Sequence, residues 1–89
     1  MKAVITVIGK DTVGIIAKVA TKCAEHSANI EDITQSVLKE YFAMIMLANI
    51  DDINVDFSEF VDALDKLGRD NHLEIRAMHE DIFDAMHTI

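Results

Sequence analysis

The chain has 89 residues, a formal net charge of −8 and a single cysteine, Cys23. At this length we expect one domain with a modest core, so a hydrophobic content of 51% leaves apolar surface for a partner to cover. The negative charge argues against nucleic acid and anionic membrane surfaces as partners, and one cysteine excludes an intramolecular disulfide and a thiolate metal cage. No segment has the length of a membrane span or the layout of a signal peptide, so we expect a cytoplasmic protein.

The first apolar segment, Lys2 to Ile8, is β-branched on both alternating faces, which predicts a central strand covered on two sides. From Val13 to Ser27, apolar residues recur at three- and four-residue spacing, which predicts an amphipathic helix with Thr12 as its N-cap. Between them, Gly9 to Ile15 holds two of only three glycines. Glycine suits a positive φ or a close approach, and the N–H groups that open a helix can hold a carboxylate. This segment is the first candidate binding loop.

The next two segments predict a β-hairpin. Asn29 to Leu38 is the most polar strand candidate, which is typical of an edge strand, whereas Tyr41 to Ile50 is again apolar on both faces. Only Lys39 and Glu40 separate them, and this turn lacks the usual glycine or asparagine.

The last third of the chain predicts a helix, a strand and a tail helix. Asp56 and Glu59 resemble a capping box, with an apolar repeat that should end near residue 70 or 71. Leu73 to Met78 is a short fourth strand, and Glu80 to Ile89 has one apolar side. We expect this tail to dock on its own domain or on a dimer mate.

The element order, β-α-β-β-α-β plus a tail helix, predicts an α+β fold of the ferredoxin-like kind. Four antiparallel strands in the order 4-1-3-2 would carry two helices on one face. The first and third strands, central in that order, are the two runs that are apolar on both faces. The face opposite the helices is then apolar as well, and the tail helix or a partner must hide it.

Two motifs resemble the ACT domain, a small regulatory module that binds amino acids. They are Gly9-x-Asp11-x-x-Gly14-Ile15 and Asn29-Ile30-Glu31-Asp32-Ile33, and the resemblance covers the whole chain. The tail sequence His79-Glu80-Asp81-Ile82-Phe83 is more narrowly similar to a family of stand-alone, single-ACT-domain prokaryotic proteins of unassigned function. The ACT module of the glycine cleavage system transcriptional repressor is a more distant likeness. On this resemblance, residues 1–79 form the ACT domain and residues 80–89 its helical tail.

The resemblance implies a ligand held between two protomers, at the first loop of one chain and the start of the second strand of the other. Antiparallel pairing of the edge strand with a two-fold mate would bring the partner's Asn29 to this loop. Amides near Val13 to Ile15 would then take a carboxylate, Asp11 an ammonium group, and the Asn29 amide either one. The candidate ligand-binding residues are Gly9, Lys10, Asp11, Thr12, Val13, Gly14, Ile15, Asn29 and Ile30.

Two of these side chains, and also Cys23, have purely structural interpretations. Asp11 can hold its own loop through an Asx-turn, and Asn29 can be the left-handed residue that ends the first helix. Cys23 lies on the apolar helix stripe and is typical of a core residue, because a reactive thiol needs exposure and a positive environment.

Two segments of the chain contain groups of possible metal ligands. The acidic run from Asp51 to Asp56 has Phe57 and Ala63 where a calcium loop needs glycine and a bidentate glutamate, which favours a solvated loop. On the tail helix the carboxylates and imidazoles share one face without a His-Glu-x-x-His pattern, which favours a solvated polar face over a metal site. That tail set consists of His79, Glu80, Asp84 and His87.

No nucleophile, base and orienting group can be placed together, so we predict no catalytic residue, no metal and no cofactor. The leading hypothesis is a non-enzymatic, homodimeric or higher-order regulatory module that senses a small ligand, an amino acid, and signals to a partner protein. The alternative is an assembly protein that keeps the ACT scaffold without a ligand and binds through its apolar sheet face and tail. A small hydrolase or metal-dependent enzyme is the third hypothesis, and it lacks a visible catalytic set.

Overall fold

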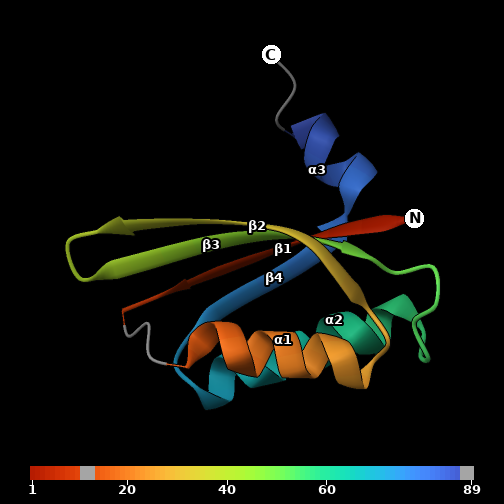
Figure 1. Ribbon diagram of the computed structural model, residues 1–89, viewed down its shortest axis with the longest axis horizontal. Helices are drawn as coiled ribbons and strands as arrows, with labels where there is room; N and C mark the ends of the chain where they lie inside the picture. Colours follow the sequence, from red (N-terminus) through yellow and green to blue (C-terminus); the bar gives the residue numbers. More distant parts are fainter. Residues whose placement is uncertain (11–13, 87–89) are drawn as a thin grey trace.

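Figure 1 shows the computed structural model, which describes residues 1–10 and 14–86. Its elements are β1 (Lys2–Gly9), α1 (Ile15–Glu25), β2 (Asn29–Leu38), β3 (Tyr41–Asn49), α2 (Phe57–Asp70), β4 (Glu74–His79) and α3 (Glu80–Met86). The four strands form one sheet in the order β2-β3-β1-β4, and every neighbouring pair is antiparallel. The predicted ferredoxin-like α+β topology is therefore confirmed.

The sheet separates two unequal layers (Figure 1). Helices α1 and α2 cover one face, and α3 leaves the opposite face beside the N-terminus. The core lies between the sheet and the first two helices, where alternate strand residues meet the apolar helix stripes. Its largest fully buried side chains are Phe60, Ile5, Met44, Met46, Leu64, Val7, Val19 and Cys23. Burying one such side chain contributes about 1.5 to 3 kcal/mol. No helix within the described ranges is both long enough and apolar enough to cross a membrane.

Both ends of α1 differ from the predicted ones. The helix begins at Ile15, and Gly14 is its N-cap, so the predicted Thr12 cap is wrong; Thr12 itself lies outside the described residues. At the other end, Ser27 takes the left-handed conformation (φ 60°), and Ala28 N–H donates to Cys23 O at 2.9 Å. This is a Schellman closure. Ser27 rather than Asn29 therefore ends the helix, which removes that structural interpretation of Asn29.

Helix α2 ends at Asp70, as predicted, and Asp56 occupies its N-cap with an extended backbone. The Asp56 side chain makes no capping hydrogen bond, so the predicted capping box is not formed. Glu59 in the first turn still interacts favourably with the positive end of the helix. A second Schellman closure follows the helix, where Leu73 N–H donates to Gly68 O at 2.7 Å.

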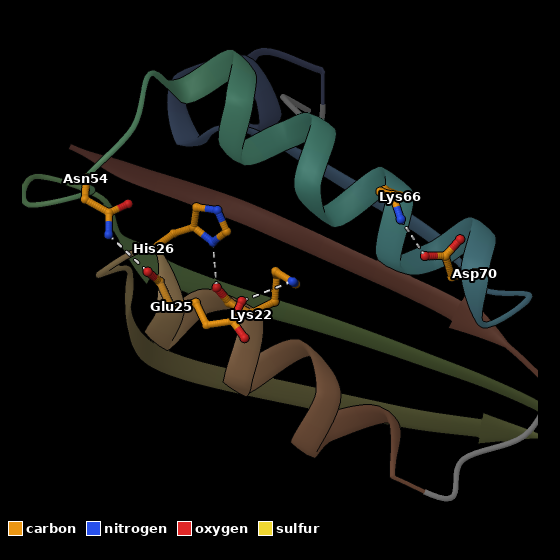
Figure 2. Close-up of polar contacts among 6 residues, drawn as sticks. All are labelled: Lys22, Glu25, His26, Asn54, Lys66 and Asp70. Carbon is orange, nitrogen blue, oxygen red and sulfur yellow. Dashed lines mark hydrogen bonds and ion pairs between the residues drawn. The ribbon is translucent and has the colours of Figure 1, made fainter.

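Polar contacts tie the end of α1 to the segment that leads into α2 (Figure 2). Asn54 Nδ2 donates to Glu25 O at 3.0 Å, and Asn54 N–H donates to His26 O at 3.2 Å. The His26 ring points between the helices, where its Nδ1 lies 2.9 Å from Lys22 O and its edge meets Phe60. Asn54, within the acidic run from Asp51 to Asp56, therefore has a structural role.

The β2–β3 hairpin has the predicted two-residue turn, since Leu38 pairs with Tyr41. Lys39 has a φ of 57° there, a value that glycine or asparagine would adopt more easily. A register shift between Ile30 and Asp32 leaves Glu31 as the extra residue of a β-bulge. The bulge sits at the beginning of the outermost strand, close to one of the candidate site motifs.

Candidate functional site

Gly9 is the last residue of β1 and is buried. A Cβ atom placed there would lie 2.3 Å from Leu73 Cδ2. Close packing of the Leu73 side chain is therefore the local reason for glycine at this position. Gly9 shapes the end of the sheet from which the candidate loop leaves.

Gly14 needs glycine for a different reason. Its φ is 74°, and an added Cβ would meet nothing within 4 Å. The constraint is conformational, and a side chain there costs roughly 1 to 2 kcal/mol. The next residue, Ile15, is buried and fixes the start of α1 in the core. The first hydrogen bond within the helix runs from Lys18 N–H to Gly14 O at 3.0 Å. The first turn carries no acidic residue, so its dipole end favours an anion.

Lys10 directly follows β1, and its ammonium group lies over Tyr41, on the sheet face opposite α1. Its side chain is exposed, and Nζ lies 5.5 Å from the centre of the Tyr41 ring, a cation–π geometry. Asp11, Thr12 and Val13 lie outside the described residues. The roles assigned to the Asp11 carboxylate and the Val13 amide therefore stay predictions.

Asn29 and Ile30 lie at the other end of the sheet. Asn29 pairs with Asn49, which pairs with Lys2, whereas Gly9 pairs with Phe42 at the far end. The length of β1 separates the two motifs by about 23 Å, at roughly 3.3 Å per residue. Asn29 is exposed, and Ile30 packs partly against the core. One chain does not bring the candidate residues together.

The strand that carries Asn29 is an edge of the sheet. Because β2 is outermost, one side of its backbone has no strand neighbour within the described residues. Helix α1 contacts β2, and the start of α1 lies toward the Leu38 end of that strand. A second copy pairing antiparallel along β2 would run in the opposite direction. The partner's Asn29 would then lie near Leu38, on the side where α1 begins.

Comparison with known proteins decides the family. The ACT domain family model matches residues 2–78. The chain belongs to the ACT domain family. It is 42% identical to the UPF0237 protein of Methanopyrus kandleri and 44% identical to that of Bifidobacterium longum, over 99% of this chain and 98% of each relative. These relatives therefore consist of the same single unit.

Solved structures of similar proteins have the same fold as this ACT domain. The ACT domain protein from Streptococcus pneumoniae is 41% identical over 98% of both chains, with a TM-score of 0.82. The regulatory subunit of aspartate kinase from Thermus thermophilus is 26% identical, with a TM-score of 0.66 over 86% of this chain and half of that one. A proposed glycine cleavage system transcriptional repressor is 23% identical, with a TM-score of 0.72 over 86% of this chain and 44% of that one, and shares the fold.

Cys23 is a core residue of this ACT domain, as predicted. It is fully buried, and burial raises the pKa of its thiol to about 11. His79 stacks on Phe57 with ring centres 4.0 Å apart, and its Nδ1 is buried with no hydrogen-bond partner in the described part of the chain. Across residues 1–10 and 14–86, no three His, Cys, Asp or Glu side chains are arranged to hold a metal; His87 lies outside these ranges.

Two ion pairs hold the end of the sheet that carries Asn29. Lys2 Nζ lies 2.9 Å from Glu31 Oε1, and this contact raises the pKa of Lys2. The N-terminal ammonium group donates to Asp51 Oδ1, which lowers the pKa of the Asp51 carboxyl. Sequence patterns gave no sign of either contact, because both join segments that are distant along the chain.

Proposed function

We propose that this ACT domain is a regulatory module that binds a small ligand, an amino acid, at the interface of a homodimer. The observation that carries the proposal is the location of the two motifs. Gly9 and Gly14 are at one end of the sheet and Asn29 is at the other, while β2 offers a free edge. A two-fold dimer along β2 turns two incomplete halves into two complete sites.

The charge pattern along β2 supports antiparallel pairing. Its first half carries Glu31 and Asp32, whereas residues 34–38 carry no charge and Lys39 follows. Antiparallel pairing sets the acidic half of one copy beside the neutral half and the lysine of the other. Parallel pairing would instead set like charges beside each other, which destabilises a sheet.

The chemistry at the first half-site suits the two ends of a free amino acid. The start of α1 favours a carboxylate, and Lys10, the first residue after β1, is the cation that the candidate loop can add. Asp11 supplies the anion that an α-ammonium group needs, and the partner's Asn29 offers both a donor and an acceptor. These contacts recognise only the carboxylate and ammonium groups that all free amino acids share. Selectivity among amino acids would therefore depend on the residues around the ligand's side chain.

Regulation follows from linkage between ligand binding and assembly. A ligand that bridges two chains binds the dimer and not the monomer, so each occupied site stabilises the dimer by about 2.7 kcal/mol at a hundred times its Kd. A partner protein that recognises one assembly state then senses the ligand. This mechanism requires no chemical step.

Assembly without a ligand is the second candidate function, and the exposed apolar surface favours it. Ile82 and Met86 on α3 and Ile8 and Ile45 on the sheet are all exposed. Such surface on a small domain marks a protein interface. The two functions differ in whether any ligand changes the assembly.

Isothermal titration of the chain against the twenty amino acids, with dimerisation followed by sedimentation velocity, tests the proposed function. We expect one or a few amino acids to bind and to strengthen the dimer. Asp11→Ala should abolish both effects, while Asp62→Ala, an exposed carboxylate on α2, should leave both unchanged. Absence of binding by all twenty, with a dimer unaffected by Asp11→Ala, would support assembly without a ligand.

A further inference from the structure

The sheet face opposite α1 and α2 has a covered end and an uncovered end. At the covered end, Val4 and Leu47 share a hollow of about 200 Å³ with Phe83 of α3. At the uncovered end, Ile8 and Tyr41 are 48% and 46% exposed, and Ile45, which is 46% exposed, lies between the two ends because it also lines the hollow. Strand alternation places the last three on one face, which we call the open patch.

Helix α3 has an apolar side that its own sheet covers only in part. Phe83 is half-buried, whereas Ile82 and Met86 are 52% and 66% exposed. Ile82 and Met86 are four residues apart and so lie on the same side of the helix. The helix leads away from the sheet in Figure 1, and the exposure of these two side chains leaves them accessible to a neighbour.

Within one chain, α3 adjoins the open patch only at Ile45, through the shared hollow. Helix α3 stands over the Val4 end of β1, and the open patch begins at Ile8, about 13 Å farther along the strand. Helix α3 follows β4 directly, with no linker between His79 and Glu80. It cannot cover Ile8 and Tyr41 of its own chain without leaving β4.

The charges around the two surfaces are complementary. Described residues of α3 include three carboxylates and no cation; they are Glu80, Asp81 and Asp84. Three of the chain's eight cations border the open patch: Lys10 over Tyr41, Lys39 in the adjacent turn and Arg76 in the same row as Ile45. Glu40 and Glu74 also border the patch, and Glu74 is paired with Arg76 at 2.6 Å. The border around Ile8 and Tyr41 therefore has a small positive balance in a chain whose net charge is −8, whereas the border at Ile45 includes Asp32.

We propose that α3 of a second copy of this chain docks on the open patch, with Ile82 and Met86 against Ile8, Ile45 and Tyr41. One chain carries both complementary surfaces, so two copies related by a two-fold axis make the contact twice. This interface uses the sheet face and α3, whereas the ligand site uses the β2 edge and the first loop. The two contacts pair different elements, with Lys10 bordering both, and together they close a tetramer.

Sedimentation velocity on matched double variants tests this interface. The α3 variant, Ile82→Glu with Met86→Glu, removes the apolar contact on α3. The patch variant, Ile8→Glu with Ile45→Glu, removes the apolar contact on the open patch and also repels the α3 carboxylates. Each double variant should have about half the assembled mass of the wild type. Ala17→Glu with Ala24→Glu adds the same charge at exposed positions on α1 and should keep the wild-type mass.

Tyr41 gives a direct readout of docking, because it is the only tyrosine and the chain has no tryptophan. Its fluorescence should become more accessible to acrylamide, by roughly two-fold or more in the quenching constant, when the α3 variant leaves the patch uncovered. The α1 control should show wild-type quenching. An unchanged mass in both double variants, or a halved mass with unchanged Tyr41 quenching in the α3 variant, would overturn the proposal. The α3 variant should still bind amino acids. A loss of α3 docking can therefore be distinguished from a failure of the ligand site.

Discussion

Mixing two inactive variants provides the sharpest test of a ligand site shared between protomers. Asp11→Ala breaks the first half-site, and Asn29→Ala breaks the second. A dimer of either variant has two broken sites. A mixed dimer has one site with both changes and one site with neither, because each chain contributes its first loop to one site and its Asn29 to the other.

The expected recovery follows from counting sites. Random exchange makes about half of all dimers mixed, so about one quarter of all sites regain both wild-type halves. Loss of a charge-assisted hydrogen bond weakens binding by roughly 10- to 100-fold, so the intact sites dominate a titration. Calorimetry of co-refolded chains should give about one quarter of the wild-type stoichiometry at the wild-type affinity.

Verified mixed dimers that bind no better than either variant alone would refute the shared site. Wild-type stoichiometry in either unmixed variant would refute the role of the changed residue. Gln35→Ala, on the same strand as Asn29, serves as the matched control and should bind normally after mixing with wild type. The test needs no knowledge of the dimer register.

Three further outcomes follow from the core and the loops. Gly68→Ala should destabilise the fold by about 1 to 3 kcal/mol, because a Cβ would lie 2.7 Å from the Leu73 carbonyl oxygen, and urea unfolding measures this loss. Cys23 should react with a thiol reagent only as fast as the protein opens, since it is fully buried and burial raises its pKa to about 11. The ammonium contact lowers the pKa of Asp51 in the folded state, so its stabilisation is present above pH 4 and fades at lower pH. The stability difference between wild type and Asp51→Asn should therefore disappear in acid-range urea titrations.

The fold was predictable because its signals are local and periodic. Apolar residues on both faces of β1 and β3 identify the central strands, and the polar β2 identifies an edge. The helix ends were less predictable. Ser27 and Asn29 both tolerate a positive φ, and the choice depends on the last hydrogen bond of α1 rather than on residue type. The bulge at Glu31 likewise leaves no mark in the sequence pattern.

The candidate site was predictable only in its parts. Gly9 and Gly14 stand out by their rarity, yet packing of Leu73 explains one and a left-handed backbone the other. No local pattern reveals a contact with a side chain as distant in sequence as Leu73. The relation between the first loop and Asn29 depends on a second chain. A single sequence contains both halves of the site but does not show how two chains bring them together.

Lys10 connects the proposed ligand site with the proposed α3 interface, because it follows the strand end at Gly9 and also lies over Tyr41 of the open patch. A cation that stabilises a bound carboxylate has less charge to offer the α3 carboxylates, so ligand binding should weaken α3 docking, and the reverse. Lys10→Met should therefore lower ligand affinity, lower the assembled mass and remove the weakening of α3 docking by ligand. Lys66→Met is the control, since Lys66 pairs with Asp70 on the exposed side of α2. A Lys10→Met chain whose assembly still responds to ligand as the wild type does would show that the two interfaces act independently.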